Sequence, residues 1–201
     1  MKKWVFLLAF FFTLAVSFQQ ASAVSLDLLP ASQTVAIGDS LTVDLFVSGL
    51  TAGGPPSVDW FDIDIGFGDP GNTLTFNSLE FGPFLGDPSD PTQTTASFTL
   101  FPGFVGVAED SLLAPAGLHA LQPSEFSLAT LTFIGSNVGS TTIVGDLYVL
   151  KDTAGNKLIH EFGPVGSAFV NVVPVHEPTT ILLVGCGLIG LAAFSRKLRK
   201  G

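Results

Sequence analysis

The fold is decided most clearly at residues 61–68, where the sequence is Phe61-Asp62-Ile63-Asp64-Ile65-Gly66-Phe67-Gly68. Large apolar residues alternate there with aspartate or glycine, which is the period of two expected of a strand with one buried and one solvated face. Residues 41–48 show the same alternation, with leucine or valine at every odd position. We therefore expect two amphipathic strands that each bury one face in a common core.

Seven further segments are expected to be strands, because turn signals rich in Gly, Pro, Asn and Asp separate them. They are residues 25–29, 74–76, 96–101, 126–133, 141–150, 158–162 and 167–173. Eight or nine short strands over about 150 residues predict an all-β sandwich of two sheets. Residues 103–123 fit this pattern least well, and we expect a long loop there with a short helical turn near 109–113.

The charges are distributed unevenly along the chain. All 17 acidic residues lie between Asp27 and Glu177, and that part contains only two lysines, so its net charge is −15. Such a surface repels phosphate backbones, which excludes nucleic-acid binding, and it disfavours contact with anionic membranes.

The N-terminus has the layout of a secretory signal peptide. Lys2 and Lys3 precede an apolar run from Trp4 to Phe18, and Ala21-Ser22-Ala23 follows as a cleavage site of the small-x-small type. We expect a signal peptide over residues 1–23 and a mature chain that begins at Val24, with an uncleaved anchor as the alternative.

The C-terminus consists of a short motif, an apolar segment and a basic cluster. The segment from Thr179 to Phe194 spans roughly 24 Å as a helix, which crosses a bilayer if the membrane thins or if the flanking basic side chains snorkel. The basic residues at 195–201 are expected to stay cytoplasmic and to leave the domain outside. Cys186, the only cysteine, lies in this segment, so the exported domain has no disulfide. We interpret Cys186 as a small residue on a helix face rather than a reactive thiol.

The exported domain, roughly residues 24–173, resembles cohesin modules in the order of its strands and turns. The resemblance is carried by Gly38-Asp39-Ser40-Leu41-Thr42-Val43, by Gly68-Asp69-Pro70 with Leu74 beyond, by Leu128-Ala129-Thr130-Leu131-Thr132-Phe133 before Gly139, and by residues 149–158 around Asp152 and Gly155. It implies a nine-stranded jelly-roll sandwich related to carbohydrate-binding modules, with a face for protein partners such as dockerins in some members. It supplies no catalytic residue.

The tail resembles the PEP-CTERM sorting signal, in which a Pro-Glu-Pro motif precedes a transmembrane segment and a basic end. Here His176 stands where the first proline is expected, and Glu177 and Pro178 match. The resemblance implies export, retention in the inner membrane and processing by an exosortase, in bacteria that build extracellular polysaccharide. It divides the tail into a tether and sorting motif at 174–178, a transmembrane segment at 179–194 and a basic end at 195–201. Without processing, the same segment is a plain membrane anchor.

Asp62 and Asp64 lie on the same face of one predicted strand, at a spacing that suits paired carboxylates in acid/base chemistry. A solvated outer face explains them more simply. Together with Asp69 and Asn72 they are also candidate oxygen ligands for calcium, although the EF-hand spacing is absent and residues 69–72 fit a turn. No other cofactor is expected.

Other chemical motifs are weaker. His119, His160 and His176 lie far apart without a partner cysteine in the domain, which argues against zinc, and neither a Gly-x-Ser-x-Gly elbow nor a phosphate loop occurs. The aromatic residues Trp60, Phe81, Phe84, Phe101 and Phe104 are candidates for a sugar-stacking platform, although most are expected in the core.

Three functional hypotheses remain. The first is a non-enzymatic binding or structural protein of the cell surface or extracellular matrix, which contacts a polysaccharide or another surface protein and is attached to the membrane at least transiently. The second is a carbohydrate-binding module that uses Trp60. The third is a glycoside hydrolase that uses Asp62 and Asp64.

Overall fold

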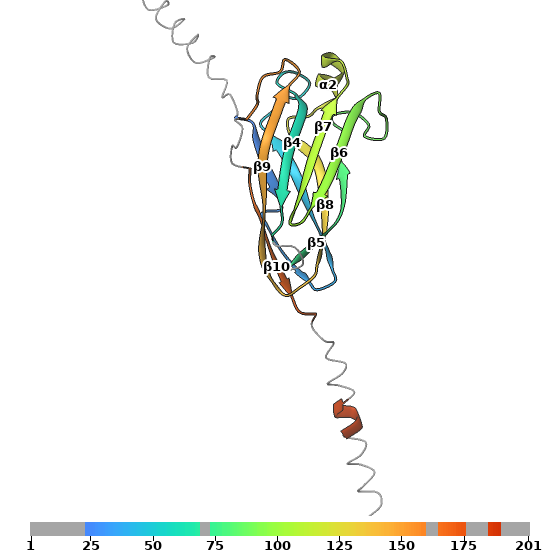
Figure 1. The fold of residues 1–201 in the computed structure, drawn as a ribbon, viewed down its shortest axis with the longest axis vertical. Helices are drawn as coiled ribbons and strands as arrows, with labels where there is room; N and C mark the ends of the chain where they lie inside the picture. The colour runs from blue at the N-terminus through green and yellow to red at the C-terminus, as the bar shows by residue number, and fades with distance from the viewer. Residues whose placement is uncertain (1–22, 69–72, 160–164, 176–184, 190–201) are drawn as a thin grey trace, which may run out of the picture.

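The computed structural model describes residues 23–68, 73–159, 165–175 and 185–189 (Figure 1). The elements of the domain are β1 (Ser25–Leu29), β2 (Ser32–Ala36), β3 (Ser40–Ser48), β4 (Val58–Gly66), β5 (Leu74–Phe81), β6 (Thr94–Phe101), β7 (Phe104–Ser111), α2 (Pro115–Leu121), β8 (Phe126–Gly135), β9 (Gly139–Asp152) and β10 (Ala168–Val173).

The strands form two sheets that face each other. One has the order β1-β3-β8-β5 and the other the order β2-β10-β9-β4-β7-β6. Neighbouring strands are antiparallel except for β10 and β2, which pair in parallel. Figure 1 shows β9, β4, β7 and β6 side by side in front, with β5 and β8 behind them and α2 at the upper end. The predicted two-sheet β-sandwich is thereby confirmed.

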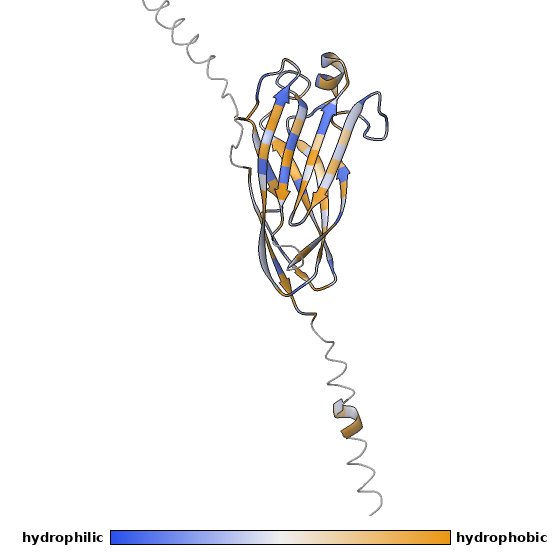
Figure 2. Ribbon diagram, viewed as in Figure 1, coloured by the Kyte–Doolittle hydropathy of each residue, from blue (hydrophilic) through white to orange (hydrophobic). Residues whose placement is uncertain are grey.

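The core lies between the two sheets and is built by the alternation that the sequence shows. In β4 the side chains of Phe61, Ile63 and Ile65 are fully buried, whereas the aspartates between them are partly exposed. In β3 the leucines and valines at positions 41 to 47 are buried in the same way. Figure 2 shows this alternation of apolar and polar residues along the front strands. Each fully buried side chain of this size stabilises the fold by about 1.5–3 kcal/mol, before conformational entropy is subtracted.

Two expectations from the sequence are wrong. The segment 103–123 is not a long loop with a helical turn near 109–113, because it contains the regular strand β7 and the helix α2. Leu158 and Ile159 do not begin a strand, and the rest of the predicted strand 158–162 lies outside the described residues. The strand β2 was not predicted, and β4, β5 and β9 are longer than expected.

Several predictions concern residues that the structure does not describe. Residues 1–22 of the predicted signal peptide, including Ala21, lie outside the described residues, which begin at Ala23. The sorting motif His176-Glu177-Pro178 also lies outside it, together with most of the segment 179–194. Cys186 is exposed within a short helix at 185–189. In the portion of the chain that is described, no helix is long and apolar enough to cross a membrane.

Candidate binding surface

The outer face of the six-stranded sheet carries polar and aromatic side chains that the strand register aligns. Trp60, Asp62 and Asp64 alternate with the buried residues of β4 and are therefore on the solvated side. On β9, Lys151 lies opposite Trp60 and Asp146 lies opposite Asp64. A register shift between β4 and β9 falls at Asp62/Ile63. We call the side chains of Trp60, Asp62, Asp64, Tyr148 and Lys151 the outer-face stripe.

One part of the stripe is a cation–π pair between Lys151 and Trp60. The Lys151 ammonium lies 4.5 Å from the centroid of the Trp60 ring. Such a contact at a solvated site contributes about 0.5–1 kcal/mol and holds both side chains in one arrangement. The ammonium covers one face of the indole, so a sugar ring that stacks there has to displace Lys151. The contact thus disfavours Trp60 as a sugar platform.

The other part of the stripe is a hydrogen-bonded pair formed by Tyr148 and Asp64. The Tyr148 hydroxyl donates to Oδ2 of Asp64 over 2.9 Å. This bond and the Asp64 charge raise the pKa of Tyr148, so the phenol keeps its proton. Partial burial, and then the charge of Asp64, raise the pKa of Asp62. The two neighbouring carboxylates repel each other, and both are stabilised by a cationic or hydrogen-bond-donating partner.

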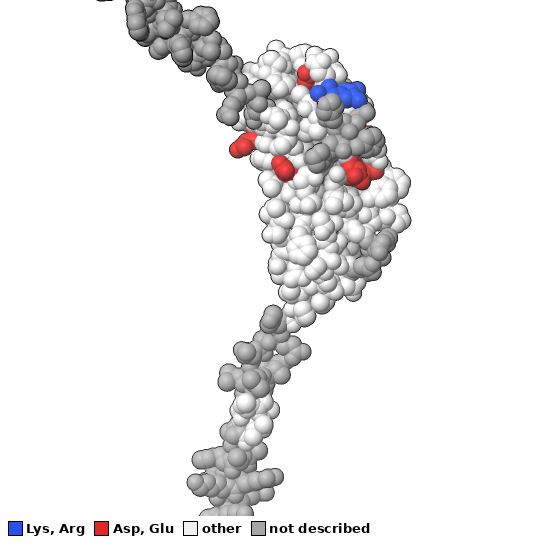
Figure 3. Space-filling model, turned by 90° about the vertical axis from the view of Figure 1, so that its left-hand side faces the viewer, with Lys and Arg blue, Asp and Glu red and all other residues white. Residues whose placement is uncertain are grey.

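Acidic residues also gather at the end of the domain that carries α2. Partial burial raises the pKa of Asp59 at the start of β4, and the charges of Asp110 and Asp152 raise it further. Figure 3 shows one side of the molecule, on which the acidic residues lie in the upper half together with one basic patch, and the described surface of the lower half is uncharged. A partner for the acidic half is therefore expected to present Lys or Arg.

The structure brings together only part of the predicted calcium site. Asp62 and Asp64 share the outer face, as expected, but Asp69 and Asn72 lie outside the described residues. Over the residues that are described, no group of three or more His, Cys, Asp and Glu side chains is arranged to hold a metal ion. A calcium site at Asp62, Asp64, Asp69 and Asn72 stays a prediction.

The candidate aromatic residues separate into two groups. Phe81 and Phe84 pack against the inter-sheet core, and the ring of Phe84 lies 4.8 Å from that of Phe126. Phe101 and Phe104 instead stack on each other, with centroids 4.6 Å apart and planes inclined by 12°, and Phe101 is exposed. Of the five residues, Phe101 and Phe104 form the stacked pair beside solvent.

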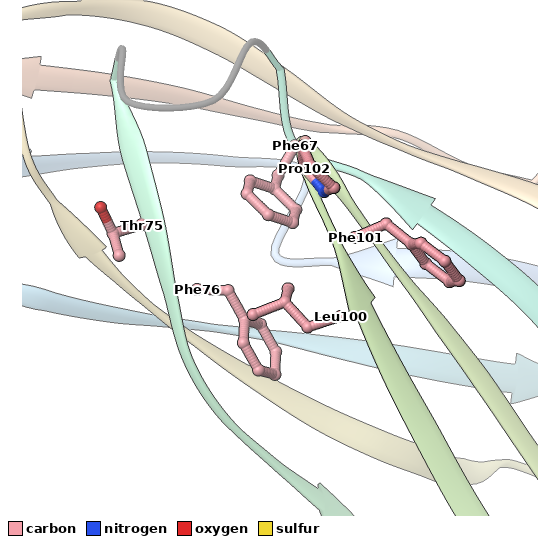
Figure 4. A pocket seen from close by; sticks show the side chains of 7 residues that line it. Phe67, Thr75, Phe76, Leu100, Phe101 and Pro102 are labelled. Atoms are coloured by element: carbon pink, nitrogen blue, oxygen red, sulfur yellow. The ribbon is translucent and has the colours of Figure 1, made fainter.

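An apolar groove that the sequence did not predict opens where β5 and β6 face each other (Figure 4). It has a volume of about 420 Å³, and its lining includes Phe67, Phe76, Leu100 and Pro102. In Figure 4 the side chains of Phe67, Phe76 and Leu100 gather between the strands, whereas Phe101 points away. The groove lies between two consecutive strands that form edges of different sheets, so it depends on how the sheets face each other and no local sequence signal identifies it.

A buried carboxyl group was also missed. Glu109 is 1% exposed on the inner face of β7, where its Oε1 accepts a 3.1 Å hydrogen bond from Thr94. Its Oε2 has no hydrogen-bond partner among the described residues. Burial raises the pKa of Glu109 to about 7, although the bond from Thr94 lowers it. The sequence could not reveal this residue, because β7 was expected to be a loop.

Comparison with solved structures places the fold among cohesin domains. The chain superimposes on the cohesin OlpA of Clostridium thermocellum, solved in complex with the dockerin Doc918, with a TM-score of 0.58 and 13% identity over 75% of this chain and 99% of that one. For the cohesin CaCohA2 of Clostridium acetobutylicum the TM-score is 0.58 at 15% identity, over 78% and 94% of the two chains. A type II cohesin of Acetivibrio cellulolyticus gives 0.55 at 15% identity, over 74% and 95%. No protein-family model and no curated protein matches the sequence. The domain therefore has a cohesin-like fold.

Proposed function

We propose that this chain is an exported, non-enzymatic binding protein that joins another protein at the cell surface or in an extracellular matrix through its outer-face stripe. The observation that carries this proposal is the ordered row of contacts on β4 and β9, where Lys151 lies over Trp60 and Tyr148 holds Asp64. Side chains fixed before binding lose little entropy when a partner docks. Aromatic residues beside charges are also typical of protein interfaces.

The cohesin-like fold supports a protein partner. Its neighbours include cohesins solved in complex with dockerins. The acidic outer face of this domain favours a partner surface with Lys or Arg, because opposite charges speed association and disfavour wrong partners.

The proposed interaction is tested by capture of proteins from the extracellular matrix of the producing cells on immobilised chain. Asp64→Lys reverses a charge in the stripe, and Glu80→Lys makes the same change on an exposed residue of the other sheet. We expect the wild type and Glu80→Lys to retain a protein that Asp64→Lys and Trp60→Ala lose. Retention of the same proteins by all four chains contradicts a binding role for the stripe.

The ends of the chain support export and sorting. The proposal includes removal of residues 1–23, insertion of 179–194 into the inner membrane and cleavage near His176-Glu177-Pro178 by an exosortase-type enzyme. The intact mass of the protein recovered from envelope and from medium tests this. A species that begins at Val24 and ends near Glu177 or Pro178 supports sorting. Full-length protein confined to the membrane supports a plain anchor and contradicts processing.

Carbohydrate binding is a second candidate because Phe101 and Phe104 present a stacked, partly exposed pair of rings. Aromatic rings beside solvent stack on apolar faces of sugars. Retention on purified polysaccharide that Phe101→Ala abolishes favours this function, with Trp60→Ala as the comparison for the other candidate ring.

Hydrolysis by Asp62 and Asp64 is less well supported, since both carboxylates lie on an open sheet face rather than in the groove. Loss of a measurable glycosidase activity in an Asp62→Asn, Asp64→Asn double variant is required for that function. An unchanged activity in this variant rules it out.

A further inference from the structure

The strand β6 is a free sheet edge without the features that usually protect one. Proteins protect exposed edges by short strands, charges, prolines or bulges. Of the four sheet edges among the described residues, β1 is short and contains Asp27, β2 has five residues, and β5 has a register shift and Glu80. β6 has eight residues without charge or proline, and it pairs with β7 without a register shift.

The register shows which main-chain groups of β6 point outward. Phe101 and Phe104 flank the two-residue turn Pro102-Gly103, which makes them a hydrogen-bonded pair. The pairing on the other side of β7 agrees with this. The N–H of Phe67, just after β4, donates to the C=O of Gly103 over 2.9 Å, so the residues of β7 that do not bond to β6 bond to β4. It follows that the N–H and C=O groups of Ala96, Phe98 and Leu100 point to the free edge.

On the inner face of this edge, the side chains of Phe98 and Leu100 are apolar and exposed. Phe98 is 48% and Leu100 is 53% exposed, although both belong to the inner face of β6. Phe98 contacts Phe76 across the groove at a centroid distance of 6.0 Å. Residues 91–108 contain no charged side chain, although the acidic part of the chain carries −15 overall. Main-chain groups and apolar side chains thus remain available together.

We propose that β6 pairs antiparallel with β6 of a second copy of this chain, so that the six-stranded sheet continues across a two-fold axis. A register centred on Phe98 sets Phe98 against its equivalent and Ala96 against Leu100, and it uses every outward N–H and C=O of these residues. Two copies of this acidic domain repel each other, and this repulsion opposes their contact least at β6, because residues 91–108 contain no charged side chain. The β6 strand of a second copy has the same length as the first and the same regular backbone, so the two edges match.

This pairing fixes the relative directions of the two β10 strands, which precede the C-terminal segments. β10 and β6 run in the same direction, because β9, β4 and β7 alternate between them in antiparallel pairs. Two antiparallel β6 strands therefore place the C-terminal ends of the two β10 strands at opposite ends of the dimer. Given the proposed function at a surface or in a matrix, such a dimer joins molecules on opposed surfaces and does not join neighbours in one membrane.

The association is tested on the full chain in mild detergent by light scattering coupled to size-exclusion chromatography, up to about 0.5 mM because small interfaces are weak. Phe98→Lys puts a charge on the free edge. Phe169→Lys is the matched control, since Phe169 is 47% exposed but belongs to β10, which is paired on both sides by β2 and β9. We expect a concentration-dependent dimer for the wild type and Phe169→Lys, and at least a tenfold weaker association for Phe98→Lys. A wild type that stays monomeric, or equal weakening by both substitutions, overturns the proposal.

Cysteine cross-linking tests the register and separates this proposal from the proposed function. In the register centred on Phe98, Ser97 lies opposite Thr99 of the second copy, at a distance that permits a disulfide. With Cys186→Ser as background, we expect a mixture of Ser97→Cys and Thr99→Cys chains to cross-link on oxidation, and each chain alone not to do so. The absence of a cross-link in the mixture overturns the register. Trp60→Ala should change neither the dimerisation nor the cross-linking. The proposed dimer can therefore be disproved while partner binding by the outer-face stripe stands, and partner binding can be disproved while the dimer stands.

Discussion

Glu109 places a carboxyl group in a core that is otherwise mostly apolar. Only one of its oxygens has a partner, and its pKa of about 7 lies above the ordinary value for glutamate because burial disfavours the charged form. The raised pKa means that this group stabilises the fold fully at pH below about 4.5, and that the contribution is lost as the pH rises through about 7.

Glu109→Gln is therefore expected to raise the free energy of unfolding at pH 8 by about 1–3 kcal/mol and to change it little at pH 5. The reason is that glutamine keeps the shape and never becomes charged. Urea unfolding at the two pH values measures the difference. An equal effect at both pH values would show that ionisation of Glu109 is not responsible.

Gln122 joins three parts of the domain. Its Oε1 accepts from the N–H of Val58 over 2.8 Å, and its Nε2 donates to the C=O of Val58 over 2.6 Å and to that of Phe84 over 3.1 Å. Gln122→Met keeps the volume but leaves the buried main chain of Val58 unpaired, so we expect a loss of about 2–4 kcal/mol in chemical denaturation. Gln33→Met is the control, because Gln33 makes its bond to Thr42 at an exposed site. A similar loss in both variants would contradict this role for Gln122.

At the scale of elements, the sequence predicted the strands whose buried faces are uniformly apolar. The alternation in β3 and β4 was sufficient because each buried position carries a large apolar side chain. The alternation did not identify β7, because Glu109 occupies one of its buried positions and Gly106 interrupts its outer face. The free edge of β6 and the groove could not be predicted, because both follow from the order of strands in the sheets. The candidate residues of β4 were identified, but their partners on β9 were not.

The β6–β7 hairpin depends on its turn. Gly103 has a φ of +84°, a conformation that glycine adopts without strain and that other residues rarely adopt. We expect Gly103→Ala to lower the free energy of unfolding by about 1 kcal/mol or more. Gly117→Ala in α2 is the control, since an added Cβ there contacts nothing within 4 Å and helices favour alanine. The thermal midpoints of both variants test this expectation, and a stable Gly103→Ala chain would contradict it.

At the scale of the whole molecule, the described domain offers two separate surfaces. The outer-face stripe on β4 and β9 is polar and held by contacts that already exist, whereas the edge of β6 is uncharged and apolar. Two such surfaces allow one domain to contact a partner protein and a second copy of itself at the same time. That arrangement suits a component of an extended assembly, which is the role proposed for this chain.

The most direct test of the proposed function is hydroxyl-radical labelling of the chain in the native matrix and after purification. Trp60 and Tyr148 report on the outer-face stripe, and Leu112, which is 50% exposed outside the strands, serves as the reference. We predict that labelling of Trp60 and Tyr148 relative to Leu112 falls several-fold in the matrix and recovers on purification. Equal relative labelling in the two states would contradict a binding function for this face.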